Sequence, residues 1–77
     1  MKLPILSAKK IIKVLEKDGF EVIRQKGSHI SLFKRSGDKT YLVVVPNKKE
    51  VKSGTLLGIL KQAGMSRKRL SELLKKI

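Results

Sequence analysis

The spacing of apolar residues changes twice along this chain, and no other sequence feature limits the possible folds so strongly. Ala8, Ile11, Ile12 and Leu15 recur at the spacing of one helix face, within a segment that runs from about residue 8 to 18. Between residues 20 and 45, short runs of alternating and β-branched residues are typical of strands. Helical spacing then returns near Thr55. The order helix, strands, helices predicts an α+β fold.

Capping residues set the expected helix ends. Ser7 is a predicted N-cap, Gly19 a predicted left-handed C-terminal residue, and Gly64 the end of a second helix that starts near Thr55. Ser66 is the predicted N-cap of a short third helix. Two apolar pairs, Leu6 with Ile11 and Met65 with Leu70, stand at the positions of hydrophobic staples. The expected core faces of the later helices consist of Leu56, Ile59, Leu60, Ala63, Leu70, Leu73, Leu74 and Ile77.

Three strands are predicted between the first two helices, at 20–26, 28–35 and 40–45, and Pro46 ends the third. Short turns at 26–28 and 36–39 join them, so we expect an antiparallel meander. In the second strand, Ile30 and Leu32 should point to one side and His29, Ser31 and Phe33 to the other. This α-β-β-β-α order, with helices on one sheet face and a short C-terminal helix added, is the layout of the double-stranded-RNA-binding domain. The 77 residues are expected to form one domain, 1–77, with the other sheet face left open for a ligand.

The charge balance points to a polyanionic partner. Nineteen Lys and Arg against six acidic residues give a formal net charge of +13, which favours nucleic acid or an acidic protein over a merely solvated surface. No helix pairs a basic face with an aromatic one, so a membrane surface is a weaker candidate. The absence of cysteine, of a long apolar run and of a secretory signal pattern leads us to expect a cytoplasmic protein.

The residues available for catalysis are few. The six acidic residues are scattered, so no pair is expected to hold Mg²⁺, and one histidine without cysteine cannot form a zinc site. We therefore expect neither a metal nor another cofactor. His29 remains, a residue type that exchanges protons near neutral pH, with Arg24 and Lys26 close by in the sequence. RNA carries its own nucleophile, the 2′-hydroxyl, so cleavage without a metal needs a base to activate that hydroxyl, cations to stabilise the charge on phosphorus and a proton for the leaving 5′-oxygen. His29 can be the base, and Lys26, Lys48 or water can supply the other two. A surface histidine in a plain hairpin turn is the alternative.

Several segments, taken in order, resemble the HicA toxins over nearly the whole chain from about residue 7. They are Gly19-Phe20, Arg24-Gln25-Lys26-Gly27-Ser28-His29, Val44-Val45-Pro46, Gly54-Thr55-Leu56 and Ile59-Leu60-Lys61-Gln62-Ala63-Gly64. The resemblance implies an mRNA interferase with the double-stranded-RNA-binding-domain fold, the toxin of a type II toxin–antitoxin pair. It implies that His29, in the Gly27-Ser28-His29 motif, is catalytic, and that a HicB-type antitoxin covers the active surface. The expected products carry a 2′,3′-cyclic phosphate and a 5′-hydroxyl.

We expect the residues that bind RNA to be Arg24, Lys26, Gly27, Ser28 and Lys48, with Lys9, Lys10, Lys49 and Lys52 as looser candidates. One position departs from the family pattern. Many members carry a second histidine just after the Val-Pro, where this chain has Lys48, and lysine is a slow proton carrier at neutral pH. A structured-RNA-binding module without catalysis would explain the fold and charge equally well. A structural DNA-binding protein is less well supported, because no groove-reading helix is evident.

Overall fold

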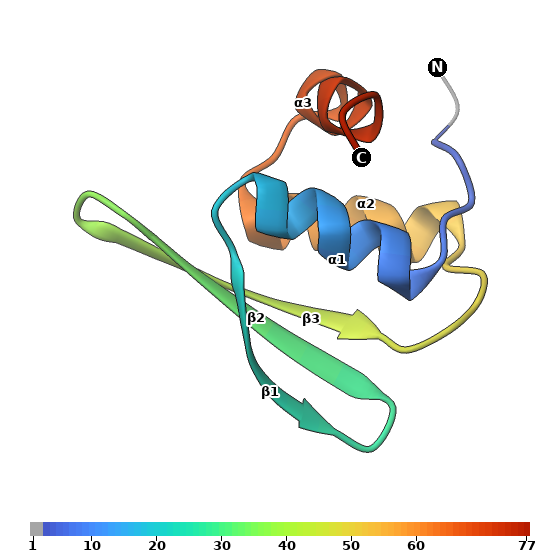
Figure 1. Ribbon diagram of the computed structural model, residues 1–77, viewed down its shortest axis with the longest axis horizontal. Helices are drawn as coiled ribbons and strands as arrows, with labels where there is room; N and C mark the ends of the chain where they lie inside the picture. Colours follow the sequence, from blue (N-terminus) through green and yellow to red (C-terminus); the bar gives the residue numbers. More distant parts are fainter. Residues whose placement is uncertain (1–2) are drawn as a thin grey trace.

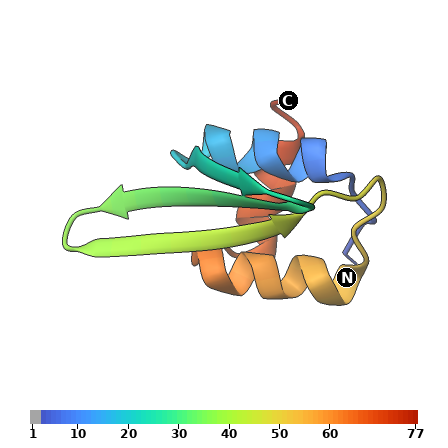
Figure 2. The ribbon, with the colours of Figure 1, turned by 90° about the horizontal axis from the view of Figure 1, so that it is seen from below.

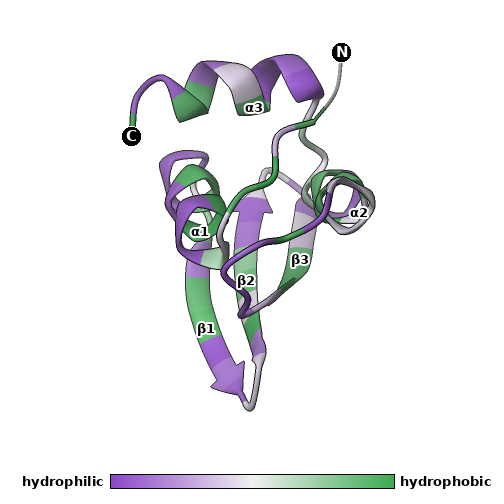
Figure 3. Ribbon diagram, turned by 90° about the vertical axis from the view of Figure 1, so that its right-hand side faces the viewer, coloured by the Kyte–Doolittle hydropathy of each residue, from purple (hydrophilic) through white to green (hydrophobic). Residues whose placement is uncertain are grey.

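The predicted α+β architecture is confirmed. A computed structural model describes residues 3–77 and contains, in chain order, α1 (Ala8–Lys17), β1 (Glu21–Lys26), β2 (His29–Ser36), β3 (Lys39–Pro46), α2 (Ser53–Ala63) and α3 (Arg67–Leu74). The strands form one antiparallel sheet in the order β1-β2-β3. α1 covers the sheet on the β1 side and α2 on the β3 side, and α3 packs on the far side of α1 (Figures 1 and 3). One sheet face therefore carries all the helices.

The first two helices end in the same way, and both endings send an apolar residue into the core. After α1, the Gly19 amide donates to the Glu16 carbonyl and the Phe20 amide to the Leu15 carbonyl. After α2, the Gly64 amide donates to the Lys61 carbonyl and the Met65 amide to the Leu60 carbonyl. These bonds form two Schellman motifs, each with a glycine at positive φ.

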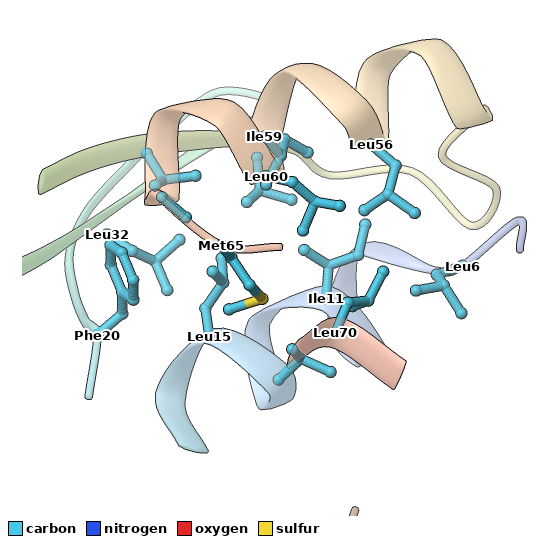
Figure 4. Packing of buried hydrophobic residues seen from close by; sticks show 14 of the residues in the cluster. Leu6, Ile11, Leu15, Phe20, Leu32, Leu56, Ile59, Leu60, Met65 and Leu70 are labelled. Atoms are coloured by element: carbon cyan, nitrogen blue, oxygen red, sulfur yellow. The ribbon is translucent and has the colours of Figure 1, made fainter. Parts of the chain in front are cut away.

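The core lies between the sheet and the helices. Ile30 and Leu32 from β2 and Val43 and Val45 from β3 are buried, and they belong to one cluster with apolar residues of all three helices (Figure 4). Phe20 and Met65, the residues that follow the two glycines, are buried there too. The predicted N-caps are also confirmed, because the Ser7 and Ser66 hydroxyls accept from the Lys10 and Arg69 amides. The alternation predicted for β2 is correct.

Some expected boundaries and faces are wrong by one or two residues. Phe20 lies between α1 and β1 and not in β1, because its amide closes the Schellman motif that ends α1. β2 starts at His29 because Gly27 and Ser28 form the two-residue turn. α2 starts at Ser53, without the side-chain cap that would mark it in the sequence. Ile77 lies beyond α3 and is 39% exposed. Within α1, the fully buried residue that the sequence pattern missed is Val14, whereas Ile12 is only partly buried.

The sheet extends beyond the helices. The far end of the β2–β3 hairpin, around Gly37, projects past α1 and α2 (Figure 2). Near α1, β1 has an irregularity at Ile23, where the pairing with β2 shifts by one residue. The outer edge of β3 is partly covered by α2, because the Gln62 side-chain oxygen accepts from the Val44 amide at 3.3 Å. Since this bond satisfies a backbone group on an edge strand, it makes that edge less available for pairing with another chain.

Candidate functional site

His29 is the first residue of the central strand and lies at one end of the sheet. It pairs with Lys26 of β1 on one side and with Pro46 of β3 on the other. Its side chain is exposed, while its neighbour Ile30 is buried, so the imidazole lies on the sheet face that carries no helix. A central strand is held from both sides, and the position of His29 is therefore fixed by two ladders of hydrogen bonds.

The turn before His29 depends on Gly27. Gly27 has φ +58, and no residue other than glycine has a positive φ in the described chain. A positive φ at the first turn position followed by a negative one matches a type II′ turn, whose twist suits a two-residue hairpin. The turn places Lys26 directly across from His29. In such a pair the two Cβ atoms lie about 5 Å apart, so both side chains can reach one phosphate.

A second cation lies one row further along the same face. Arg24 pairs with Ser31, and Ser31 alternates with the buried Ile30 and Leu32, so it shares the open face with His29. Arg24 and Lys26 are exposed, and both ion pairs found within residues 3–77 are made by Asp18 with Lys34 and Arg69. The cations beside His29 are therefore not neutralised by acidic side chains of the described chain.

Backbone hydrogen bonds attach the loop after β3 to this end of the sheet. The Asn47 amide donates to the Ser28 carbonyl at 2.7 Å, and the Lys48 amide donates to the Pro46 carbonyl at 2.9 Å. The Lys48 carbonyl in turn accepts from the Ala8 amide at 2.9 Å. Asn47 and Lys48 together thus link the turn that precedes His29 to the start of α1. Figure 1 shows the β1–β2 turn and this loop at the same end of the molecule.

The remaining predicted RNA-binding residues lie further from His29. Lys9 and Lys10 are exposed in the first turn of α1, next to the Lys48 carbonyl. Lys49 and Lys52 flank Glu50 and the buried Val51, whose amide donates to the Leu6 carbonyl at 2.7 Å. Lys48 and Lys52 also line a pocket of about 140 Å³, together with Pro46 and Glu50. The structure therefore gathers Lys26, Gly27, Ser28, His29 and Lys48 at one sheet end, with the other lysines leading away along the loop and α1.

Two features of this region were not predicted from the sequence. The first is the role of Asn47, whose amide joins the loop to the turn; this contact depends on the chain path, which residue types do not reveal. The second is the group of apolar residues on the open sheet face, although the alternation of β3 contains the signal. Within residues 3–77, no group of three or more His, Cys, Asp or Glu side chains is placed to hold a metal ion. In the part of the chain that the structure describes, no helix has the length and apolar character required to cross a membrane.

Comparison with protein families gives one match that bears on this site. Residues 8–65 match the family described as the HicA toxin of bacterial toxin-antitoxin systems. No curated protein and no solved structure matches the chain. The match covers α1, the whole sheet and α2, and it includes His29 and every predicted RNA-binding lysine and arginine. More than half of the sequence is matched, so the chain belongs to the HicA toxin family.

Proposed function

We propose that this toxin is a metal-independent endoribonuclease that cleaves mRNA with His29 as its general base. Membership in the HicA family implies ribonuclease activity in general and an antitoxin partner. The observation that carries the proposal for His29 is its setting, an exposed imidazole on the open sheet face, directly across from Lys26 and beside the turn that Asn47 anchors. A base beside an unpaired cation is the minimum that RNA cleavage requires, because the substrate brings its own nucleophile.

In the proposed reaction, the imidazole of His29 takes the proton from a ribose 2′-hydroxyl. The 2′-oxygen forms a bond to the adjacent phosphorus, and the bond from phosphorus to the 5′-oxygen of the next nucleotide breaks. The products are a 2′,3′-cyclic phosphate and a 5′-hydroxyl, whose proton comes from Lys48 or from water. Arg24 and Lys26 stabilise the negative charge that grows on the phosphate oxygens, a contribution that is large when the cations are already in place.

The RNA would extend from His29 across the turn and the loop. Gly27 and Ser28 lie beside the reacting phosphate, and Lys48, Lys49 and Lys52 follow along the loop. Lys9 and Lys10 continue this basic path at the start of α1. A HicB-type antitoxin is proposed as the partner that covers the active surface. Because mRNA is the proposed substrate, the cytoplasm is the compartment in which the toxin would act.

The test compares wild-type protein with His29→Ala and His29→Gln on a defined RNA in the presence of EDTA. Removing a general base lowers the rate by about 10²- to 10⁴-fold, so cleavage should become hard to detect in both variants. A substrate with 2′-O-methyl groups should resist the wild-type enzyme, because its nucleophile is blocked. Product 5′ ends should accept phosphate from polynucleotide kinase without prior phosphatase treatment.

Three results would count against the mechanism. Cleavage that stops in EDTA would indicate a required metal, and cleavage that survives both substitutions would remove His29 from the chemistry. Products with 5′-phosphate ends would require water as the nucleophile. Tight, salt-sensitive RNA binding without any cleavage by the wild-type protein would instead favour the non-catalytic RNA-binding module.

A further inference from the structure

The open sheet face carries three large apolar side chains that the fold does not need. Phe33 of β2 pairs with Leu42 of β3, and Val44 lies in the next row of the same face. Leu42 is 57% exposed and Val44 is 37% exposed, and Phe33 is half-buried. The residues that alternate with them, Leu32 and Val43, are completely buried on the helix side. We call Phe33, Leu42 and Val44 the apolar patch.

Such a patch is unusual for a sheet with one face in water. Strands of that kind commonly alternate apolar residues toward the core with polar residues toward solvent. Polar side chains at the three positions would leave the core unchanged, since none of the three lies on the helix side. Single exposed apolar residues are normal, whereas a contiguous apolar patch with a polar rim is typical of an interaction surface. The apolar patch therefore indicates a partner that covers the open face.

The patch and His29 lie on the same face of the same strand. Phe33 is four residues after His29, a distance of about 13 Å along an extended strand. Val44 pairs with Ser31, which lies midway between them. An occupant as large as a protein domain, seated on the patch, would therefore extend over His29 and exclude RNA.

Charge and side-chain type decide among the possible occupants. A second copy of this chain would bring another +13 of net charge against a face rimmed by Arg24, Lys26 and Arg35, so self-association is disfavoured. RNA bases stack on aromatic rings, and Phe33 is the one aromatic residue on this face, because Tyr41 lies against Gly64 on the helix side. The aliphatic Leu42 and Val44 offer no stacking surface, so RNA fits the patch less well. An apolar protein surface edged with carboxylates matches both the aliphatic patch and its basic rim.

We propose that the antitoxin of this toxin binds the apolar patch through an apolar surface flanked by acidic side chains. On this proposal the patch supplies most of the affinity, and His29 is blocked because the bound protein overhangs it. The proposal rests on the proposed function only for its consequence, the loss of RNA cleavage. The binding itself is measured without RNA.

The experiment titrates purified antitoxin into Leu42→Thr, Val44→Thr and the double variant, using calorimetry. Threonine suits a strand and removes the apolar contact, so these variants should fold, as circular dichroism will check. The double variant should bind at least about 30-fold more weakly, the scale for removing apolar anchors from the centre of an interface. Its RNA cleavage without antitoxin should stay close to that of wild type, because neither residue is placed in the proposed catalytic site.

Two controls match these variants. Ile5→Thr removes an apolar side chain that is 62% exposed but lies before α1, and it should leave the affinity unchanged. His29→Ala should also bind antitoxin within about threefold of wild type, which separates binding from catalysis. Wild-type affinity in the double variant, or equal weakening by Ile5→Thr, would overturn the proposal. Loss of RNA binding in the patch variants, with antitoxin affinity retained, would assign the face to RNA instead.

Discussion

Two glycines in α2 and its C-terminal turn should respond oppositely to the same substitution. Gly64 has φ +65, and a Cβ placed on it would lie 2.8 Å from Cε1 of Tyr41. Gly58 lies inside the helix, where a Cβ would meet no atom within 4 Å. Gly64→Ala should therefore destabilise the protein, whereas Gly58→Ala should stabilise it.

The magnitude for Gly64→Ala has two parts. Holding alanine in the left-handed region costs about 1 kcal/mol, and moving the half-buried Tyr41 ring adds about 1–2 kcal/mol, as overpacking typically does. The total of about 2–3 kcal/mol should lower the melting temperature by roughly 10–20 °C in a domain of this size. Gly58→Ala should raise the free energy of unfolding by about 0.8–1.0 kcal/mol, the difference in helix propensity between the two residues.

Urea denaturation followed by circular dichroism measures both changes, and a Tyr41→Val background separates the two parts for Gly64. Valine also favours a strand but lacks the ring, so in that background Gly64→Ala should cost only the backbone part, about 1 kcal/mol. An equal cost in both backgrounds would show that the contact with Tyr41 contributes nothing. A destabilising Gly58→Ala would contradict the claim that position 58 has room for a methyl group and that helix propensity decides the effect.

Two further substitutions test the electrostatic features. Asp18 accepts from Lys34 at 3.1 Å and from Arg69 at 3.2 Å, joining α1, β2 and α3, so Asp18→Ala should lower the free energy of unfolding by about 2 kcal/mol. The effect should shrink in 1 M salt, because the Arg69 side chain is 43% exposed, and an effect independent of salt would contradict an ionic cause. Lys48→His restores the residue that many family members carry there, and it should raise the RNA cleavage rate about tenfold or more, because histidine moves protons faster near neutral pH. An unchanged rate in single-turnover assays would exclude a proton-transfer role for position 48.

Local signals made most of the fold predictable. Ser7, Gly19, Gly64 and Ser66 mark helix ends by the hydrogen bonds that their own side chains or backbone can make, and the structure contains those bonds. The alternation in β2 likewise follows from strand geometry, so the exposure of His29 was predictable before its environment was known. Such features depend on residues within about one turn of each other, so they can be predicted from the local sequence alone.

Features that depend on distant segments were not predictable in the same way. The start of α2 lacks a side-chain cap, and its position is fixed by the bridge between Leu6 and Val51, which are 45 residues apart (51 − 6). The hydrogen bond from the Asn47 amide to the Ser28 carbonyl joins residues on two different hairpins, so it could be predicted only if the relative position of both were known. The residues of the candidate site were named from the sequence, and their roles, argued from side-chain chemistry and from the family resemblance, remain predictions. The structure adds the order in which these residues lie around His29.

The alternation of the strands separates the residues that hold the fold from those proposed to act. His29, Leu42 and Val44 all lie on the open face, and their neighbours Ile30, Val43 and Val45 fill the core on the other face. A substitution on the open face therefore removes no core contact, and a loss of cleavage or of antitoxin affinity can be attributed to the side chain changed. The same reasoning extends to Lys48, since its hydrogen bonds to Pro46 and Ala8 use backbone atoms only. Replacing its side chain leaves the loop attached, so Lys48→His reports on proton transfer and not on the position of the loop.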